Sequence, residues 1–170
     1  MFTAQFQFQN NTWITLSDQG VTSPDFILCF GDRELIEEGM YKSFFNNKYP
    51  EAPILIVSSA GEINNNRVSE NSIVANAVEF TAASSRIKYN AINLKDYESS
   101  TEAGFDLVNG LVEDDLKLVL VFSDGQLVNG SELVDGINSV IQKSVPVTGG
   151  LAADGEDFNK TLVGIKEILL

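Results

Sequence analysis

The sequence contains no histidine and a single cysteine, Cys29, among its 170 residues. The absence of histidine removes the commonest general base near neutral pH and the commonest protein ligand of zinc and haem. A single cysteine excludes an intramolecular disulfide and a cluster of thiolates around a metal. Because Cys29 lies in the apolar run Phe26–Phe30, we expect a buried, inert thiol and not a nucleophile.

Basic residues are also scarce, since 11 Lys and Arg oppose 24 Asp and Glu for a net charge of −13. Seven acids and no basic residue lie between Lys95 and Lys117. A surface of this charge repels the phosphates of nucleic acids and of anionic membranes, so we expect neither as a partner. We interpret the acidic surface as a source of solubility, with an acidic docking face as the alternative.

Long hydrophobic runs are missing as well. No segment approaches the roughly 18 apolar residues of a membrane span. The stretch Met1–Gln9 alternates apolar and polar residues and lacks the basic, then apolar layout of a signal peptide. We therefore expect a cytoplasmic protein. Its length and its hydrophobic share of 44% suit one soluble domain.

The apolar patterning that is present predicts an α/β fold: a single domain with a mixed, mostly parallel sheet, crossover helices and antiparallel hairpins. Period-two alternation predicts a hairpin of Phe2–Gln9 with Trp13–Leu16. Ile73–Phe80 and Arg86–Asn93, joined by residues 81–85, predict a second antiparallel pair. The chain turns apolar again over Thr161–Leu170.

Two β-α-β units are predicted, because continuous apolar strands joined by helices pair in parallel. In the first, Phe26–Phe30 leads through a helix over residues 33–47, with Asp32 as its N-cap, to Ile54–Val57. The second runs from Leu118–Phe122 through a helix capped at Asn129 to Val145–Val147. Before it, the S-x-x-E box of Ser99 and Glu102 predicts the start of another helix.

Small residues and carboxylates follow the predicted strands in four loops: Gly31–Asp32, Ser58–Glu62, Ser123–Gly130 and Thr148–Gly155. Because parallel strands place their carboxyl ends along one edge, we expect the four loops to converge in a ligand cleft. Backbone N–H groups and helix starts bind anions, and carboxylates bind ammonium groups or hard cations. Such a mixture suits a zwitterion such as an amino acid. The alternative is that the glycines only make turns and the acids only cap helices.

The pair Gly149–Gly150 is the part of these loops that turn chemistry explains least. Thr148 is predicted to end a strand, and the apolar Leu151–Ala152 follows the glycines. We therefore predict that the pair lets the backbone approach a ligand closely. At least one of the two is expected at positive φ, where only glycine is unpenalised.

Catalysis is not predicted. Ser59 and Ser123 have no histidine to serve as their base, and neither lies in a G-x-S-x-G elbow. Neither a Walker A nor a G-x-G-x-x-G motif is present. The remaining enzymatic alternative is a metal-dependent hydrolase that uses Glu62, Asp124 and Asp154 as ligands.

Three motifs occur together in an order that resembles the N-terminal half of the FIST domain, named for F-box and intracellular signal transduction proteins. They are SerSerAlaGlyGluIle at 58–63, ValPheSerAspGly with AsnGlySerGluLeu within 121–133, and ValProValThrGlyGlyLeuAlaAlaAspGlyGluAspPhe with Lys160–Thr161 at 145–161. The resemblance extends from about Pro24 to Val163. Its most specific part is the glycine-rich block with Phe158 and Thr161 downstream.

The resemblance implies a cytoplasmic sensory module that binds a small molecule such as an amino acid. It also implies a signalling partner: a histidine kinase, a chemoreceptor or a cyclic-dinucleotide enzyme in bacteria, and an F-box protein in eukaryotes. A protein-interaction module without a small ligand is the alternative. No cofactor is expected, because the lack of histidine argues against the haem that some members bind. The implied ligand-binding residues are Ser59, Ala60, Gly61, Glu62, Asp124, Gly125, Asn129, Gly130, Gly149, Gly150, Asp154 and Gly155.

Two departures from the family pattern bear on these expectations. The family has a helix between its opening strand and the strand that matches Phe26–Phe30, but only Ser17–Asp25 is available here. The family module also continues past Val163 into further strands and a C-terminal half. We therefore expect the chain to be truncated at its C-terminal end, with the missing half as one of its partners.

Overall fold

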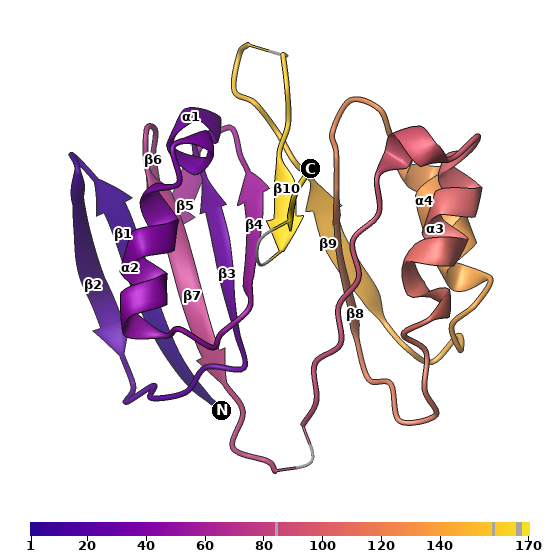
Figure 1. Ribbon diagram of the computed structural model, residues 1–170, viewed down its shortest axis with the longest axis horizontal. Helices are drawn as coiled ribbons and strands as arrows, with labels where there is room; N and C mark the ends of the chain where they lie inside the picture. Colours follow the sequence, from indigo (N-terminus) through magenta and orange to yellow (C-terminus); the bar gives the residue numbers. More distant parts are fainter. Residues whose placement is uncertain (84, 158, 166–167) are drawn as a thin grey trace. The chain divides into compact units, whose positions relative to one another are not determined.

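The chain divides into two compact units in the computed structural model, which describes residues 1–83, 85–157, 159–165 and 168–170 (Figure 1). Unit 1 comprises residues 1–87 and 153–169, and unit 2 comprises residues 88–152 with Leu170. Each unit has its own apolar core. The single FIST-like domain expected over residues 1–170 stays a prediction.

Unit 1 is built on a seven-stranded mixed sheet with the strand order β11-β10-β4-β3-β7-β1-β2. The strands are β1 Phe2–Gln9, β2 Thr12–Asp18, β3 Phe26–Gly31, β4 Ile54–Ser58, β7 Ile73–Glu79, β10 Val163–Ile165 and β11 Ile168–Leu169. The predicted hairpin β1–β2 and the predicted parallel pair β3–β4 are both confirmed. Between β2 and β3 the chain forms no helix, which agrees with the first departure from the family pattern.

The helical connection in unit 1 differs from the prediction of one helix over residues 33–47. It consists of α1 Arg33–Glu37 and α2 Met40–Lys48. Gly39 separates them, because it takes the left-handed conformation at φ +73° and its N–H donates to the carbonyl of Ile36. Asp32 is the N-cap of α1, as predicted, and its carboxylate accepts the N–H groups of Glu34 and Leu35.

Aromatic and β-branched residues hold α2 against the sheet. Phe6 of β1 packs edge-on against Phe45, and the ring of Trp13 stacks on Phe44 with 4.6 Å between centroids. Cys29 is fully buried in the same core, as expected, and burial raises the pKa of its thiol far above the usual range. The thiol therefore stays neutral and inert.

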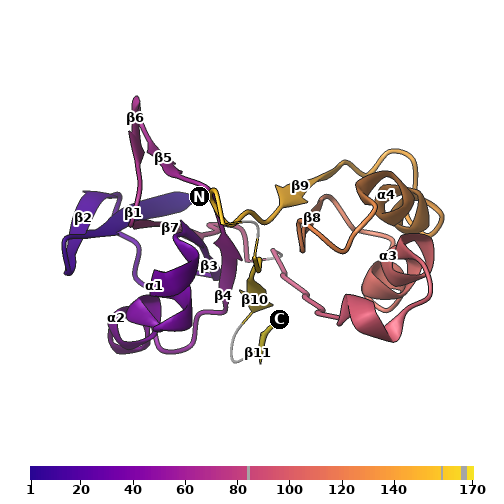
Figure 2. The same cartoon turned by 90° about the horizontal axis from the view of Figure 1, so that it is seen from above.

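The prediction that residues 86–93 form an antiparallel strand beside β7 is wrong. Residues 86–93 form no strand, because β7 already pairs with β1 along one edge and with β3 along the other. Of the loop predicted before them, Ser84 lies outside the described residues. A short hairpin that the sequence did not predict, β5 Glu62–Asn64 and β6 Arg67–Ser69, precedes β7. Figure 2 shows α1 and α2 on one face of the sheet and this hairpin projecting from the other.

Unit 2 contains two helices, α3 Ser100–Asn109 and α4 Gly130–Asn138, packed beside a parallel pair of strands, β8 Val119–Ser123 and β9 Val147–Leu151. A single 3-10 turn, Leu94–Asp96, precedes α3. The second predicted β-α-β unit is thereby confirmed, but its last strand runs over Val147–Leu151 and not over the predicted Val145–Val147. The predicted Ser99 cap is present too, since Ser99 Oγ accepts the N–H of Glu102, but the Glu102 carboxylate accepts the N–H of Glu98 instead of that of Ser99.

Two glycines let the helices of unit 2 lie very close together. A Cβ atom on Gly104 would lie 2.2 Å from the carbonyl oxygen of Leu133, and one on Gly136 would lie 2.0 Å from that of Thr101. Larger residues at either position would force the helices apart. The buried core of this unit consists of Ala103, Val108, Leu133, Ile137 and Ile141.

The α/β class with a mixed sheet, crossover helices and antiparallel hairpins is confirmed. Parallel pairing is a smaller share than predicted, because within the described residues it is limited to β3–β4 and β8–β9. None of the helices in the described ranges has the length and apolar character needed to cross a bilayer.

Candidate functional site

The predicted site residues are divided evenly between the two units. Ser59, Ala60, Gly61, Glu62, Asp154 and Gly155 belong to unit 1, and Asp124, Gly125, Asn129, Gly130, Gly149 and Gly150 belong to unit 2. Each group is described within its own unit. Convergence of the four loops on one edge stays a prediction.

In unit 1 the central polar group is the carboxylate of Glu62, which is only 2% exposed. It accepts hydrogen bonds from Ser59 Oγ at 2.8 Å and from Ser72 Oγ at 2.5 Å. Burial raises the pKa of Glu62, and the charge of Asp32 adds to the rise, while the two hydroxyl groups oppose it. Because Ser59 precedes the β5–β6 hairpin and Ser72 follows it, the carboxylate ties both ends of the hairpin together.

Ser58 and Ser59 attach neighbouring segments to the carboxyl end of β4. The backbone and the hydroxyl of Ser58 bond the backbone of Leu162, and its carbonyl accepts the N–H of Ala153 at 2.9 Å. The N–H of Ser59 donates to the carbonyl of Gly31 at 3.0 Å. Within unit 1, the carboxyl end of β4 is therefore bonded to that of β3 and to Ala153 and Leu162.

The carboxylate of Asp154 accepts hydrogen bonds from three other residues of unit 1. Its Oδ1 accepts from Arg33 Nε at 2.6 Å, and its Oδ2 accepts the N–H groups of Asn159 and Lys160 at 2.9 Å each. Burial on its own would raise the pKa of Asp154, but the hydrogen bonds from Lys160, Arg33 and Asn159 together lower it. Asp154 therefore holds this loop to the start of α1. Gly155 follows at φ +55° with open space around it, which is ordinary turn chemistry. Phe158, which belongs to the quoted motif, lies outside the described residues.

In unit 2, Asp124 shapes the turn that leads into α4. Its Oδ1 accepts the N–H of Gln126 at 2.8 Å and that of Leu127. Gly125 lies within this turn, and Gly130 is the first residue of α4 with open space beside it. Asn129 caps α4 through the N–H of Glu132, and its own N–H donates to Ser100 Oγ at 2.9 Å. That last bond joins the starts of α3 and α4.

The glycine pair lies inside β9 and not beyond it, so the prediction that Thr148 ends a strand is wrong. Gly149 pairs with Val121 of β8, and Gly150 pairs with Phe122. Gly149 has φ +154°, which confirms positive φ at one of the two residues, and a Cβ there would lie 1.6 Å from the carbonyl oxygen of Val121. The close approach that Gly149 permits is therefore to the neighbouring strand. Gly150 has open space around it.

A surface cavity of about 420 Å³, open to solvent because most of its lining residues are exposed, lies in unit 2 where the starts of α3 and α4 meet. This volume falls within the roughly 300–1,000 Å³ typical of small-molecule sites. The lining residues are Leu94, Tyr97, Glu98, Ser99, Ser100, Leu127, Asn129 and Glu132. Of the predicted site residues only Asn129 is among them. The capping signals at Ser99 and Asn129 predicted two helix starts, but nothing in the sequence placed the two side by side.

The lining of this cavity is polar, with an apolar part. Glu98 and Glu132 supply carboxylates, Ser99 and Ser100 supply hydroxyl groups, and the cavity has no Lys or Arg in its lining. Burial raises the pKa of the Tyr97 phenol, and the charge of Asp106 acts in the same direction, so the phenol stays protonated at neutral pH. Such a lining can bind an ammonium group. Within the described chain no three His, Cys, Asp or Glu side chains are grouped to hold a metal ion.

The fold and this cavity define an α/β domain with room for a small molecule beside two joined helix starts. The FIST N domain family matches residues 25–169, and the chain belongs to that family. Domains of this family are generally sensor modules of signal transduction, and the family is not one of known enzymes. No curated protein and no solved structure matches the chain.

Proposed function

We propose that the chain is a cytoplasmic sensor domain of a signal-transduction protein, and that the cavity of unit 2 is its small-molecule site. The observation that carries the proposal is the cavity itself, which has the volume of a ligand site and includes Asn129, a residue that the sequence had already assigned to ligand binding. Membership of a sensory family supports the same assignment.

The ligand we propose is a small molecule with an ammonium group, and an α-amino acid is the simplest example. The ammonium group would bind the carboxylates of Glu98 and Glu132. A ligand carboxylate would face the positive ends of the α3 and α4 dipoles, which meet at this point. Leu94 and Leu127 supply apolar contact for a ligand side chain.

A thermal-shift screen of the full chain against the standard amino acids and simple amines tests this proposal, with calorimetry on any compound that stabilises it. Glu132→Gln should weaken binding by about 1.5 kcal/mol, or roughly tenfold, which is the low end for a charge-assisted hydrogen bond because Glu132 is exposed. The matched control is Asp135→Asn, an exposed acid on the same helix that is not in the lining.

Two results would contradict the cavity as the site. One is a screen without a stabilising compound. The other is an equal loss of affinity in Glu132→Gln and Asp135→Asn, because a loss of that kind reflects only the total charge of α4.

A second candidate function, a protein-interaction module, is favoured by the β5–β6 hairpin. Ile63 and Val68 lie directly opposite one another on its two strands and are 71% and 72% exposed. An exposed apolar pair of this kind suits a protein partner such as a histidine kinase, a chemoreceptor, a cyclic-dinucleotide enzyme or a C-terminal FIST half. Replacing both residues by serine should abolish binding to such a partner and leave the ligand response intact. Unchanged partner binding would remove the hairpin from the interface.

A further inference from the structure

The outer edge of β2 is a strand edge open for pairing. β2 is the last strand in the order of the seven-stranded sheet, and within the described residues its only partner strand is β1. Figure 1 shows β2 at the margin of unit 1. An edge of this kind presents a row of backbone N–H and C=O groups that can bond another strand, and natural sheets commonly protect it with charged residues or proline.

The hairpin β1–β2 has neither of these protections. Residues 1–17 contain no proline and no Asp, Glu, Lys or Arg side chain. Asp18 is the first charged residue, in a chain whose net charge is −13. At this charge two copies of the chain repel one another, so a neutral hairpin is the surface at which they can approach with the least repulsion.

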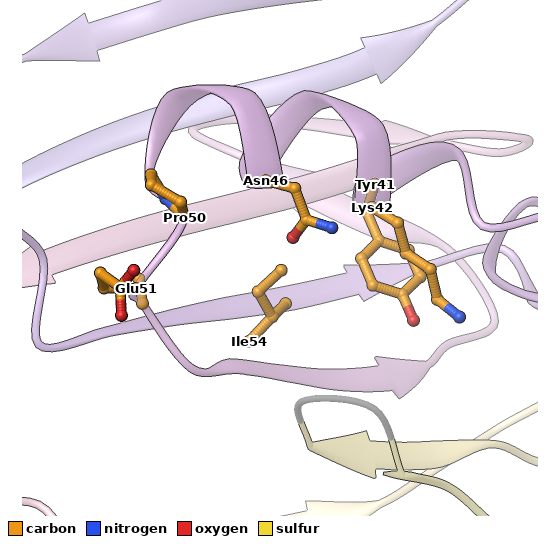
Figure 3. A pocket seen from close by; sticks show the side chains of 7 residues that line it. Tyr41, Lys42, Asn46, Pro50, Glu51 and Ile54 are labelled. Atoms are coloured by element: carbon orange, nitrogen blue, oxygen red, sulfur yellow. The ribbon is translucent and has the colours of Figure 1, made fainter.

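Charged side chains, in contrast, border the depression between α2 and the beginning of β4 (Figure 3). Lys42 and Glu51 are exposed at its rim, and Ile54 beneath them is buried. A contact between two copies at this depression would have to remove both charges from water. A contact at the edge of β2 requires no such desolvation.

The turn of the hairpin determines which backbone groups of β2 point outward. Its two central residues, Asn10–Asn11, have φ +50° and +60°, as in a type I′ turn, so the residues on either side of them form a hydrogen-bonded pair. Bonded and non-bonded pairs alternate along an antiparallel ladder. Trp13 and Thr15 therefore form the non-bonded pairs with β1, and their N–H and C=O groups point away from it.

This edge is complementary to itself about a two-fold axis at Ile14. Antiparallel pairing of two copies about that axis places Trp13 of each copy opposite Thr15 of the other, which makes about four backbone hydrogen bonds. Ile14, which is 49% exposed, then faces Ile14 of the second copy, at the closer spacing of a non-bonded pair. The register shift of the β1–β2 ladder and the charge of Asp18 both lie beyond Thr15, outside the segment that pairs.

We propose that the chain forms a symmetric dimer in which the β2 strands of two copies pair through Trp13–Thr15 and join the two seven-stranded sheets into one. A pairing this short buries less than the roughly 1,200–2,000 Å² of a standard interface, so the dimer is weak and reversible. The surface is separate from the β5–β6 hairpin and from the cavity of unit 2, so dimerisation does not depend on a ligand.

Sedimentation equilibrium of the full chain between about 10 μM and 1 mM, the range of weak complexes, tests this proposal. We expect a monomer–dimer equilibrium that Ile14→Lys weakens at least tenfold, because like charges then face one another across the axis. The matched control is Ile63→Lys, which adds the same charge at a 71% exposed position of β5 and should dimerise like the natural chain. Mixing Ile14→Lys with Ile14→Glu should restore a dimer, because opposite charges then face one another.

Hydrogen exchange of the natural chain gives a test that remains decisive if a variant fails to fold. Protection of the Trp13 and Thr15 amides should rise with protein concentration, whereas that of Ile14, which lies in a bonded pair with β1, should not change.

Any of four results would overturn the proposal. They are a monomer at every concentration, equal weakening of the dimer by Ile14→Lys and Ile63→Lys or by neither, no dimer from the mixture of the two Ile14 variants, and exchange at Trp13 and Thr15 that is independent of concentration.

Discussion

Replacing Gly149 by alanine should destabilise unit 2 severely, because the added methyl group has no room. Its Cβ would lie 1.6 Å from the carbonyl oxygen of Val121 and 2.7 Å from the carbonyl carbon. Both neighbours are backbone atoms of the paired strand, so neither can move like a flexible side chain. Ordinary contact begins near 3.4 Å, so β8 and β9 would have to separate by about 1.8 Å.

The expected loss of stability in Gly149→Ala can be estimated from the two ways in which the chain can respond to the added methyl group. Separating the strands breaks about two ladder hydrogen bonds, each with a net value of about 1 kcal/mol. Keeping the strands paired holds an alanine at φ +154°, a conformation that costs roughly 1–3 kcal/mol in addition to the clash. We therefore expect the free energy of unfolding to fall by about 2–4 kcal/mol.

Gly150 supplies the matched control in the same strand. It has no positive φ, and a Cβ there meets nothing within 4 Å. Gly150→Ala should therefore leave stability within about 0.5 kcal/mol, or raise it slightly because alanine restricts the unfolded chain.

Urea denaturation of the full chain, followed by circular dichroism, measures both variants, and hydrogen exchange at the Val121 amide reports on the β8–β9 pair. Equal unfolding free energies for Gly149→Ala and Gly150→Ala would refute the reasoning, because the two positions differ only in the space and the φ angle described above.

Two further substitutions test the packing of unit 2 and the buried carboxylate of unit 1. Gly136→Ala should lower the free energy of unfolding by about 1–3 kcal/mol, because its Cβ would lie 2.0 Å from the carbonyl oxygen of Thr101. The control Gly130→Ala should leave the free energy of unfolding unchanged, because the space beside Gly130 is open. Equal stability of the two variants in urea would contradict this packing. The pKa of Glu62 is raised in the folded protein, so its contribution to stability is present below the usual glutamate pKa and is lost as the pH rises through the raised value. The free energy of unfolding, measured between about pH 4 and pH 8, should not show this loss in Glu62→Gln. The exposed control Glu70→Gln should show the same loss as the natural chain. If the pH profile of Glu62→Gln equals that of the natural chain, another group titrates.

Local signals in the sequence were enough to predict several strands, the helix caps and the family of this protein. Alternation of apolar and polar residues was enough to predict β1 and its hairpin with β2, because a strand half-exposed on one face needs that period. The caps at Asp32, Ser99 and Asn129 were predictable because each side chain accepts an N–H two or three residues further along. The three quoted motifs were enough to predict the family.

Tertiary structure decided what depends on partners far apart in the chain. The sequence does not show that β7 lies between β1 and β3. Because both edges of β7 are paired, residues 86–93 cannot pair with it. Nor does the sequence tell that Gly149 faces Val121, because a glycine that approaches a ligand and one that approaches a neighbouring strand have the same local signature.

The cavity of unit 2 belongs to the same category. It lies where a hydrogen bond from Asn129 to Ser100 joins the starts of α3 and α4, two helices that Gly104 and Gly136 let pack closely. Residue types and spacing determine which elements form, since those depend on neighbours within a few positions. The space that remains between elements depends on how their side chains pack, and only the folded chain decides that.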